Sequence, residues 1–65
     1  MKLQDALDRF NAIRDVVYDP EVAHSLEDNL REDILVAIAG GCKNVRKLAQ
    51  IALETGSIDF PRWYA

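Results

Sequence analysis

Residues 34–41 read ILVAIAGG, six consecutive apolar side chains followed by two glycines in the middle of a chain of 65 residues. Such a run requires burial on nearly all sides, so we expect the rest of the chain, or a second copy of it, to pack around this segment. A short apolar run also suits a buried strand, but Val22 and Leu30 lead into it with helical spacing. The run is therefore predicted to close a helix, which Gly40 or Gly41 ends as the left-handed residue.

The same periodicity extends outward and predicts an all-α fold of three short helices, over about residues 2–18, 20–39 and 44–55. Asp19 followed by Pro20 is typical of a helix start, and Asn44 is the expected N-cap of the third helix. In that third helix one apolar face is predicted and Ile51 falls on the opposite side. The predicted core positions are Leu3, Leu7, Phe10, Ile13 and Val17 in the first helix, Val22, Leu26, Leu30, Ile34 and Ala37 in the second, and Val45, Leu48, Ala49, Ala52 and Leu53 in the third.

The length allows one domain, residues 1–65, whose core is marginal because so short a chain buries only about 60% of the surface that it exposes when unfolded. Cys42 is the single cysteine and His24 the single histidine, so neither an internal disulfide nor a structural zinc site is expected. Self-association is the remaining source of stability. We therefore expect a homodimer or higher oligomer, with Leu35, Val36 and Ile51 as the apolar residues left over for it.

Charge is distributed unevenly along the chain. Residues 1–33 carry nine acidic and four basic side chains, and residues 34–65 carry two acidic and four basic ones, which gives about −5 and +2 within a net charge of −3. An acidic face is expected on the first two helices, and a chain of this charge disfavours non-specific nucleic-acid binding. That face comprises Asp5, Asp8, Asp15, Glu27, Asp28, Glu32 and Asp33.

The surroundings expected for the chain follow from its short apolar runs and its free thiol. The first ten residues alternate charged and apolar side chains too quickly for a secretion signal. The longest apolar run is far shorter than the roughly 20 residues of a membrane-spanning helix. No membrane association is predicted, and the free thiol favours a cytoplasmic location.

Residues 38–49, IAGGCKNVRKLA, resemble the first turn and supporting helix of helix-turn-helix regulators, which implies DNA binding by residues 34–56. Lys43, Arg46 and Lys47 are the candidate phosphate contacts. The resemblance stops there, because the segment that should form the recognition helix reads SIDFPRWYA and contains Pro61. DNA binding is therefore the alternative interpretation.

The C-terminal segment, residues 57–65, holds three of the five aromatic side chains. Phe60, Arg62, Trp63 and Tyr64 are residue types that dominate binding hot spots, and we take them as the candidate protein-binding residues. Two other readings stay open: the segment packs on its own core, or it is exchanged between two copies.

Catalysis is not expected, because three short helices enclose little volume and no nucleophile has a suitable base beside it. No cofactor or metal site is predicted, and a solvated charged face explains the spacing of His24 and Asp28. The sequence thus favours a non-enzymatic interaction module of the adaptor, inhibitor or accessory-regulator type, such as phages and mobile elements encode, that binds itself and another protein.

Overall fold

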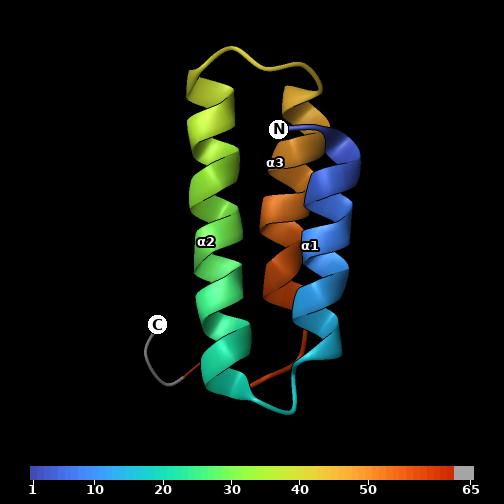
Figure 1. Cartoon of the computed structure of the whole chain (residues 1–65), viewed down its shortest axis with the longest axis vertical. Helices are drawn as coiled ribbons and strands as arrows, with labels where there is room; N and C mark the ends of the chain where they lie inside the picture. The colour runs from blue at the N-terminus through green and yellow to red at the C-terminus, as the bar shows by residue number, and fades with distance from the viewer. Residues whose placement is uncertain (63–65) are drawn as a thin grey trace.

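The computed structural model describes residues 1–62 and shows three helices that run antiparallel to their neighbours in the chain (Figure 1). Helix α1 spans Leu3–Asp15, α2 spans Pro20–Ala39 and α3 spans Val45–Glu54, after which a short 3-10 turn, η1, covers Thr55–Ser57. No strand occurs among these residues. The all-helical, three-helix prediction is confirmed, although α1 ends three residues before the predicted boundary.

The helix boundaries follow from local capping chemistry. The Asp19 carboxylate accepts a hydrogen bond from the backbone amide of Val22 at 3.3 Å, and Pro20 occupies the first helical position of α2. At the other end of α2, Gly41 adopts φ 84°, the left-handed conformation that ends a helix. Asn44 precedes α3 with φ 60° and makes no side-chain cap, so its role is to reverse the backbone.

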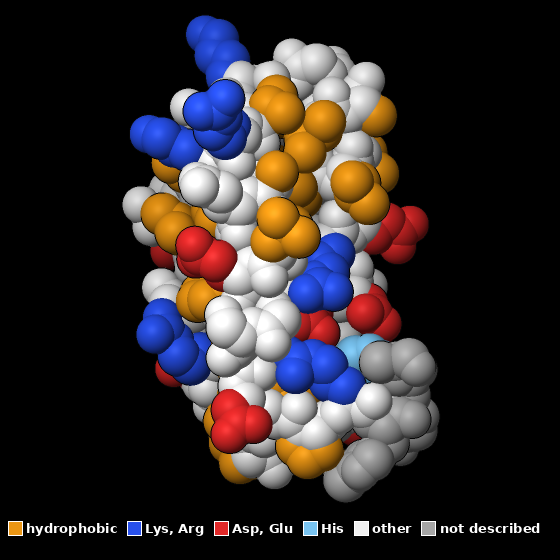
Figure 2. Space-filling view, turned by 180° about the vertical axis from the view of Figure 1, so that it is seen from behind, with side chains coloured by type: hydrophobic (Ala, Val, Ile, Leu, Met, Phe, Trp, Pro, Cys, Tyr) orange, Lys and Arg blue, Asp and Glu red, His pale blue; other side chains and the backbone are white. Residues whose placement is uncertain are grey.

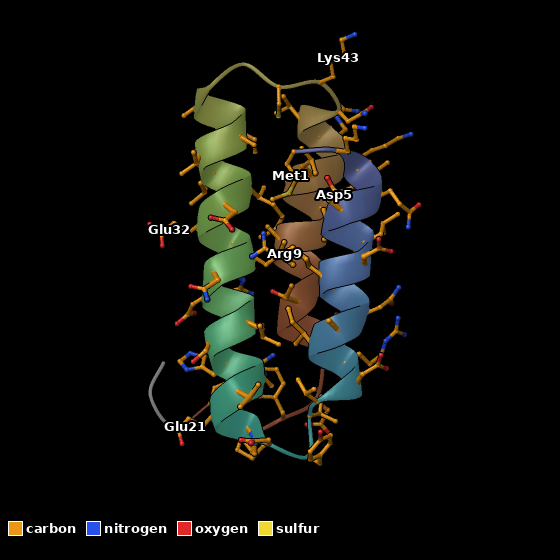
Figure 3. All side chains as sticks on the ribbon, in the orientation of Figure 1. Met1, Asp5, Arg9, Glu21, Glu32 and Lys43 are labelled. Atoms are coloured by element: carbon orange, nitrogen blue, oxygen red, sulfur yellow. The ribbon has the colours of Figure 1, made fainter. Side chains whose placement is uncertain are left out.

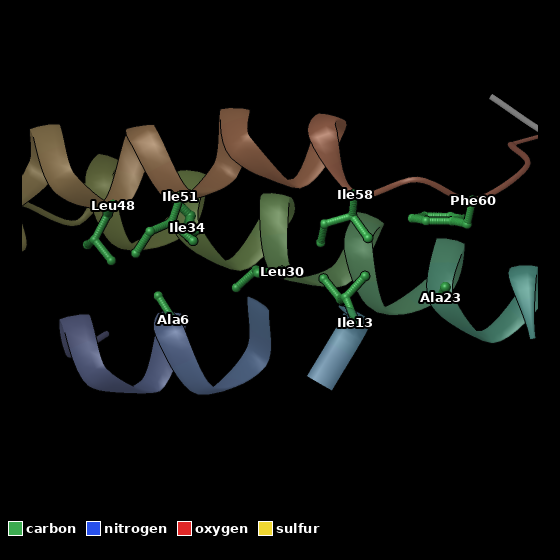
Figure 4. Packing of buried hydrophobic residues seen from close by; sticks show 9 residues of the cluster. All are labelled: Ala6, Ile13, Ala23, Leu30, Ile34, Leu48, Ile51, Ile58 and Phe60. Carbon is green, nitrogen blue, oxygen red and sulfur yellow. The ribbon is translucent and has the colours of Figure 1, made fainter. Parts of the chain in front are cut away.

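The core lies along the line where the three helices meet and continues beneath the C-terminal segment (Figure 4). Ile51 is 6% exposed and Leu53 is 78% exposed. The predicted face of α3 is therefore wrong at both positions, because α3 packs against α1 and α2 together and its core line runs through Leu48, Ile51 and Thr55. The buried apolar residues are Ala6, Ile13, Ala23, Leu30, Ile34, Leu48, Ile51, Ile58 and Phe60.

The apolar run at the end of α2 is not enclosed on all sides. Ile34 is fully buried, whereas Leu35 and Val36 are each 65% exposed. With α1 and α3 as the neighbours of α2, one side of the helix stays uncovered in this chain. The expectation of near-complete burial thus fails within a single copy.

A polar contact ties α1 to α2 on the outside of the bundle. Arg9 reaches from α1 toward α2 (Figure 3), and its Nη1 donates to Oδ2 of Asp33 at 2.8 Å. Both side chains are partly solvated, so this ion pair contributes at most about 1 kcal/mol. Its role is to orient the two helices.

No helix in the described part of the chain, residues 1–62, has the length and apolar character needed to cross a membrane.

Candidate interaction surface on helices α2 and α3

The C-terminal segment folds back over the end of the bundle. Ile58 and Phe60 are 7% and 5% exposed, and both side chains join the core (Figure 4). The Arg62 guanidinium lies over the Phe60 ring, 3.8 Å from its centroid. Of the four residues predicted to bind a partner, Phe60 and Arg62 are thus engaged within the chain, and Trp63 and Tyr64 lie outside the described residues.

Arg62 is held by a buried carboxylate on α2. Its Nε and Nη2 donate to the two carboxylate oxygens of Glu27 at 3.0 and 3.1 Å, and Nη2 also donates to the carbonyls of Thr55 and Ile58. The two parallel hydrogen bonds use the planar fork of arginine, which makes the contact both strong and directional. The C-terminal segment is consequently anchored by charge as well as by apolar packing.

A second arginine completes this polar cluster. Arg31 Nε donates to the carbonyl of Ala52 at 3.0 Å and to the hydroxyl of Thr55 at 2.8 Å, and its Nη2 lies 3.8 Å from Oε2 of Glu27. It therefore links α2 to the end of α3. No buried side-chain nitrogen or oxygen in the described part of the chain lacks a hydrogen-bond partner.

Glu27 is 2% exposed, although the sequence analysis assigned it to a solvated acidic face. Burial raises the pKa of Glu27, but hydrogen bonds with Arg62 and Thr55 and the charges of Arg31 and Arg62 lower it more, so the net pKa lies below its ordinary value of 4.5. A sequence signal for the burial existed. Glu27 shares a helical stripe with the buried residues Ala23, Leu30 and Ile34, and only its charge argued against the core.

Leu35 on α2 and Leu53 on α3 are among the most exposed large apolar side chains, at 65% and 78% exposure. A shallow groove of about 240 Å³ lies between them, lined by Arg31, Leu35, Ala52 and Leu53. Figure 2 shows apolar side chains gathered on this side of the molecule, above two basic side chains. Helical spacing extends the patch, which we call the α2–α3 face: Leu35, Ala39, Val45, Ala49, Ala52 and Leu53.

The predicted self-association residues are separated by the fold. Leu35 lies on the α2–α3 face, and Val36 is equally exposed but points about 100° farther around α2. Ile51 belongs to the chain's own core and offers no surface. Leu53 was missed because its helical spacing placed it on the predicted core stripe of α3.

The candidate phosphate contacts lie at the end of the bundle where α2 turns into α3. Lys43, Arg46 and Lys47 are all exposed, and none of their side chains makes a hydrogen bond or ion pair with another residue in 1–62. Arg9, by contrast, is paired across the bundle, and Figure 3 shows Lys43 extending away from it. The three cations are available to a negatively charged group outside the chain.

The geometry around these cations differs from a helix-turn-helix, whose two helices cross at about 90–120°. Here α2 and α3 lie side by side and antiparallel (Figure 1). In the described chain α3 is followed by the 3-10 turn η1 and an extended segment, where such a motif places its recognition helix. Neither a protein-family model nor a curated protein nor a solved structure matches the chain.

His24, Glu27 and Asp28 form the one group of metal-ligand types found among residues 1–62, with ligand atoms within 4.8 Å of one another. Both oxygens of Glu27 accept hydrogen bonds from Arg62. His24 Nε2 lies 3.6 Å from Oδ2 of Asp28. The cluster is explained by these internal contacts.

Proposed function

We propose that the protein is a non-enzymatic helical interaction module that acts as a homo-oligomer and binds other protein surfaces as an adaptor, inhibitor or accessory regulator. One observation carries this proposal: Leu35 and Leu53 stand exposed beside the same groove, whereas every buried side-chain nitrogen and oxygen in residues 1–62 has a hydrogen-bond partner. Burying a leucine contributes about 1.5–3 kcal/mol, so burial of two leucines per copy would add substantially to the stability of a chain of this size. An oligomer buries these leucines in the interface between copies.

Sedimentation equilibrium over about 1 µM to 1 mM, the range in which oligomers of moderate affinity dissociate, tests the proposal. We expect the weight-average mass to rise from the 7.3 kDa of one chain toward a multiple of it. The midpoint of thermal unfolding should rise over the same series, because subunits that associate only when folded stabilise the folded state. A constant mass of one chain up to 1 mM would refute it.

DNA binding is the second candidate, favoured by Lys43, Arg46 and Lys47, which are exposed and form no ion pair with the described residues. Phosphate contacts of this kind weaken as salt displaces them, so the test uses a labelled duplex at about 50 mM salt. Binding by these cations predicts an anisotropy increase that a Lys43→Glu, Arg46→Glu variant loses. A flat titration of the unaltered protein removes this candidate.

A further inference from the structure

We propose that the groove between α2 and α3 binds an amphipathic helix of a protein partner, one that presents an aliphatic side chain together with a carboxylate. This binding rests on the proposed function, because it names the partner chemistry that suits the same two exposed leucines. Three features of the groove carry it: an apolar lining, an arginine with unused hydrogen-bond donors, and a positive charge that the described chain does not balance.

The groove suits a helix better than a small molecule. Leu35 from α2 and Leu53 from α3 line it together with Ala52, and its volume is about 240 Å³. Pockets for drug-sized ligands begin at about 300 Å³ and enclose most of the ligand, whereas this groove is shallow. Since α2 and α3 lie side by side (Figure 1), a third helix laid along them can place its apolar stripe between their exposed leucines.

Arg31 is the charged residue of the groove lining, and part of its hydrogen-bonding capacity is unused. Its Nε donates to the Ala52 carbonyl and the Thr55 hydroxyl, which fixes the plane of the guanidinium. Nη1 makes no hydrogen bond with the described residues, and Nη2 lies 3.8 Å from the Glu27 carboxylate, beyond hydrogen-bond length. Because the side chain is 43% exposed, a carboxylate from outside can accept hydrogen bonds from these terminal nitrogens.

The charges around Arg31 do not balance within the described chain. In residues 1–62 the ion pairs of Arg31 and Arg62 are both with Glu27. Glu27 accepts its two guanidinium hydrogen bonds from Arg62, so two guanidinium groups share one carboxylate and one positive charge is left over. A charge beside an apolar surface is screened less than one in open water, which favours a partner that brings a carboxylate to the groove.

The opposite end of the apolar patch carries another cation. Arg46 lies seven residues before Leu53, hence on the same flank of α3 and about 10 Å along the helix. Figure 2 shows basic side chains above and below the patch. The exposed acids are turned aside: Glu32 lies about 60° farther around α2 than Leu35. Glu54 lies about 100° farther around α3 than Leu53. A helix along the groove therefore meets cations toward its ends.

A selection from displayed peptides tests this preference. The probe is a library of amphipathic helices of about 20 residues, with leucines fixed on one face and the flanking positions randomised. A partner helix and a second copy bury the same leucines and compete, so the chain is used at about 1 µM, where the proposed oligomer would be dissociated. We expect Asp and Glu to be enriched beside the leucines.

The best selected peptide is then compared with its amide form, in which Gln or Asn replaces the enriched acid. The amide form should bind about tenfold more weakly, because it loses the charge-assisted hydrogen bonds with Arg31. Neutral or basic residues enriched beside the leucines, or no binder up to about 1 mM, would overturn the proposal.

Substitutions in the chain locate the binding. Leu35→Ser should weaken the selected peptide about tenfold, whereas Val36→Ser, at a neighbour with the same 65% exposure, should leave its affinity unchanged. Arg31→Gln should abolish the difference between the acidic peptide and its amide form. Equal losses at residues 35 and 36, or a difference that survives Arg31→Gln, would contradict the assignment.

A salt series on the unaltered chain decides the charge dependence if Arg31→Gln loses its helical circular dichroism. Between about 50 and 500 mM salt the acidic peptide should weaken severalfold and its amide form hardly at all, because salt screens the ion pair. Equal salt responses would overturn the role of the carboxylate.

Sedimentation equilibrium without peptide measures the self-association separately. A chain that associates but selects no acidic helix overturns this inference and leaves the proposed oligomer standing. A monomeric chain that selects acidic helices supports this inference and refutes the self-association. A monomeric chain that selects none refutes both.

Discussion

The first half of α2 packs its buried polar groups against partners within the chain, whereas its second half leaves apolar side chains exposed. Around Glu27, in the first half, two arginines, a threonine hydroxyl and the returning C-terminal segment form a polar cluster, and no buried side-chain nitrogen or oxygen in residues 1–62 lacks a partner. Around Leu35, in the second half, the neighbouring groove stays open. The difference shows that the described chain supplies hydrogen-bond partners for its buried polar groups but does not cover all of its large apolar side chains. The proposed function places a partner at the second region and not at the first.

Removing the C-terminal segment should produce the largest effect on this contrast. A chain that stops after Ser57 loses the buried side chains Ile58 and Phe60 together with Arg62. Core truncations of this size cost about 2–5 kcal/mol per residue, which exceeds the stability of many small domains. We expect loss of helical circular dichroism at 25 °C, and Asp59→Ala, at an exposed position of the same segment, should retain it.

Retained helicity in the truncated chain would show that the segment is an appendage. It would also support the sequence-based prediction that Phe60 and Arg62 bind a protein partner.

Arg62→Ala should destabilise the fold by about 3–5 kcal/mol, because Glu27 stays buried with its bidentate partner removed. Urea unfolding followed by circular dichroism measures this loss. The control is Arg9→Ala, which breaks the more exposed ion pair with Asp33 and should cost no more than about 1 kcal/mol. Equal effects of the two substitutions would contradict the distinction between the two arginines.

Two neighbours on α3 sharpen the contrast further. Ile51→Ala should cost about 2–4 kcal/mol because it opens a cavity in the core. Leu53→Ala should change stability by less than about 0.5 kcal/mol when measured at low micromolar concentration, where the proposed oligomer would be dissociated. Comparable losses at both positions would mean that α3 is rotated relative to the arrangement described here.

Acid should weaken the first region gradually and produce the smallest effect. The pKa of Glu27 is lower in the folded chain than its ordinary 4.5, so the folded form binds this proton less readily than the unfolded form. Its contribution is therefore complete above pH 4.5 and is lost as the pH falls through the lower folded pKa. Denaturant unfolding from pH 7 to pH 3 should show a steeper decline for the unaltered chain than for Glu27→Gln, and parallel declines would contradict the pKa direction.

Several parts of the fold could be predicted because they depend on neighbours in the chain. The start of α2 at Asp19 and Pro20 and its end before Gly40 and the left-handed Gly41 follow from local hydrogen bonds and backbone conformation. The rotation of α3 could not be predicted in this way. Val45, Ile51 and Leu53 are all apolar, and the choice among them depends on where α1 and α2 lie.

The candidate site was predicted only in part. Leu35 was identified as surplus because one helical stripe cannot hold it, whereas Leu53 was hidden in an apparently regular apolar pattern. The burial of Glu27 was missed because charge is a strong argument for exposure until a partner is known. That partner, Arg62, is 35 residues away in the sequence, and no local rule connects the two.

By itself the sequence determined the number and order of the helices and the caps of α2, since these depend on periodicity and on contacts within a few residues. Only the tertiary structure decided which apolar side chains are enclosed, that Glu27 and Arg62 join two distant segments, and that Leu35 and Leu53 share one uncovered face. The physical reason is that burial and pairing depend on the relative rotation of packed helices, which many weak contacts between distant residues set together.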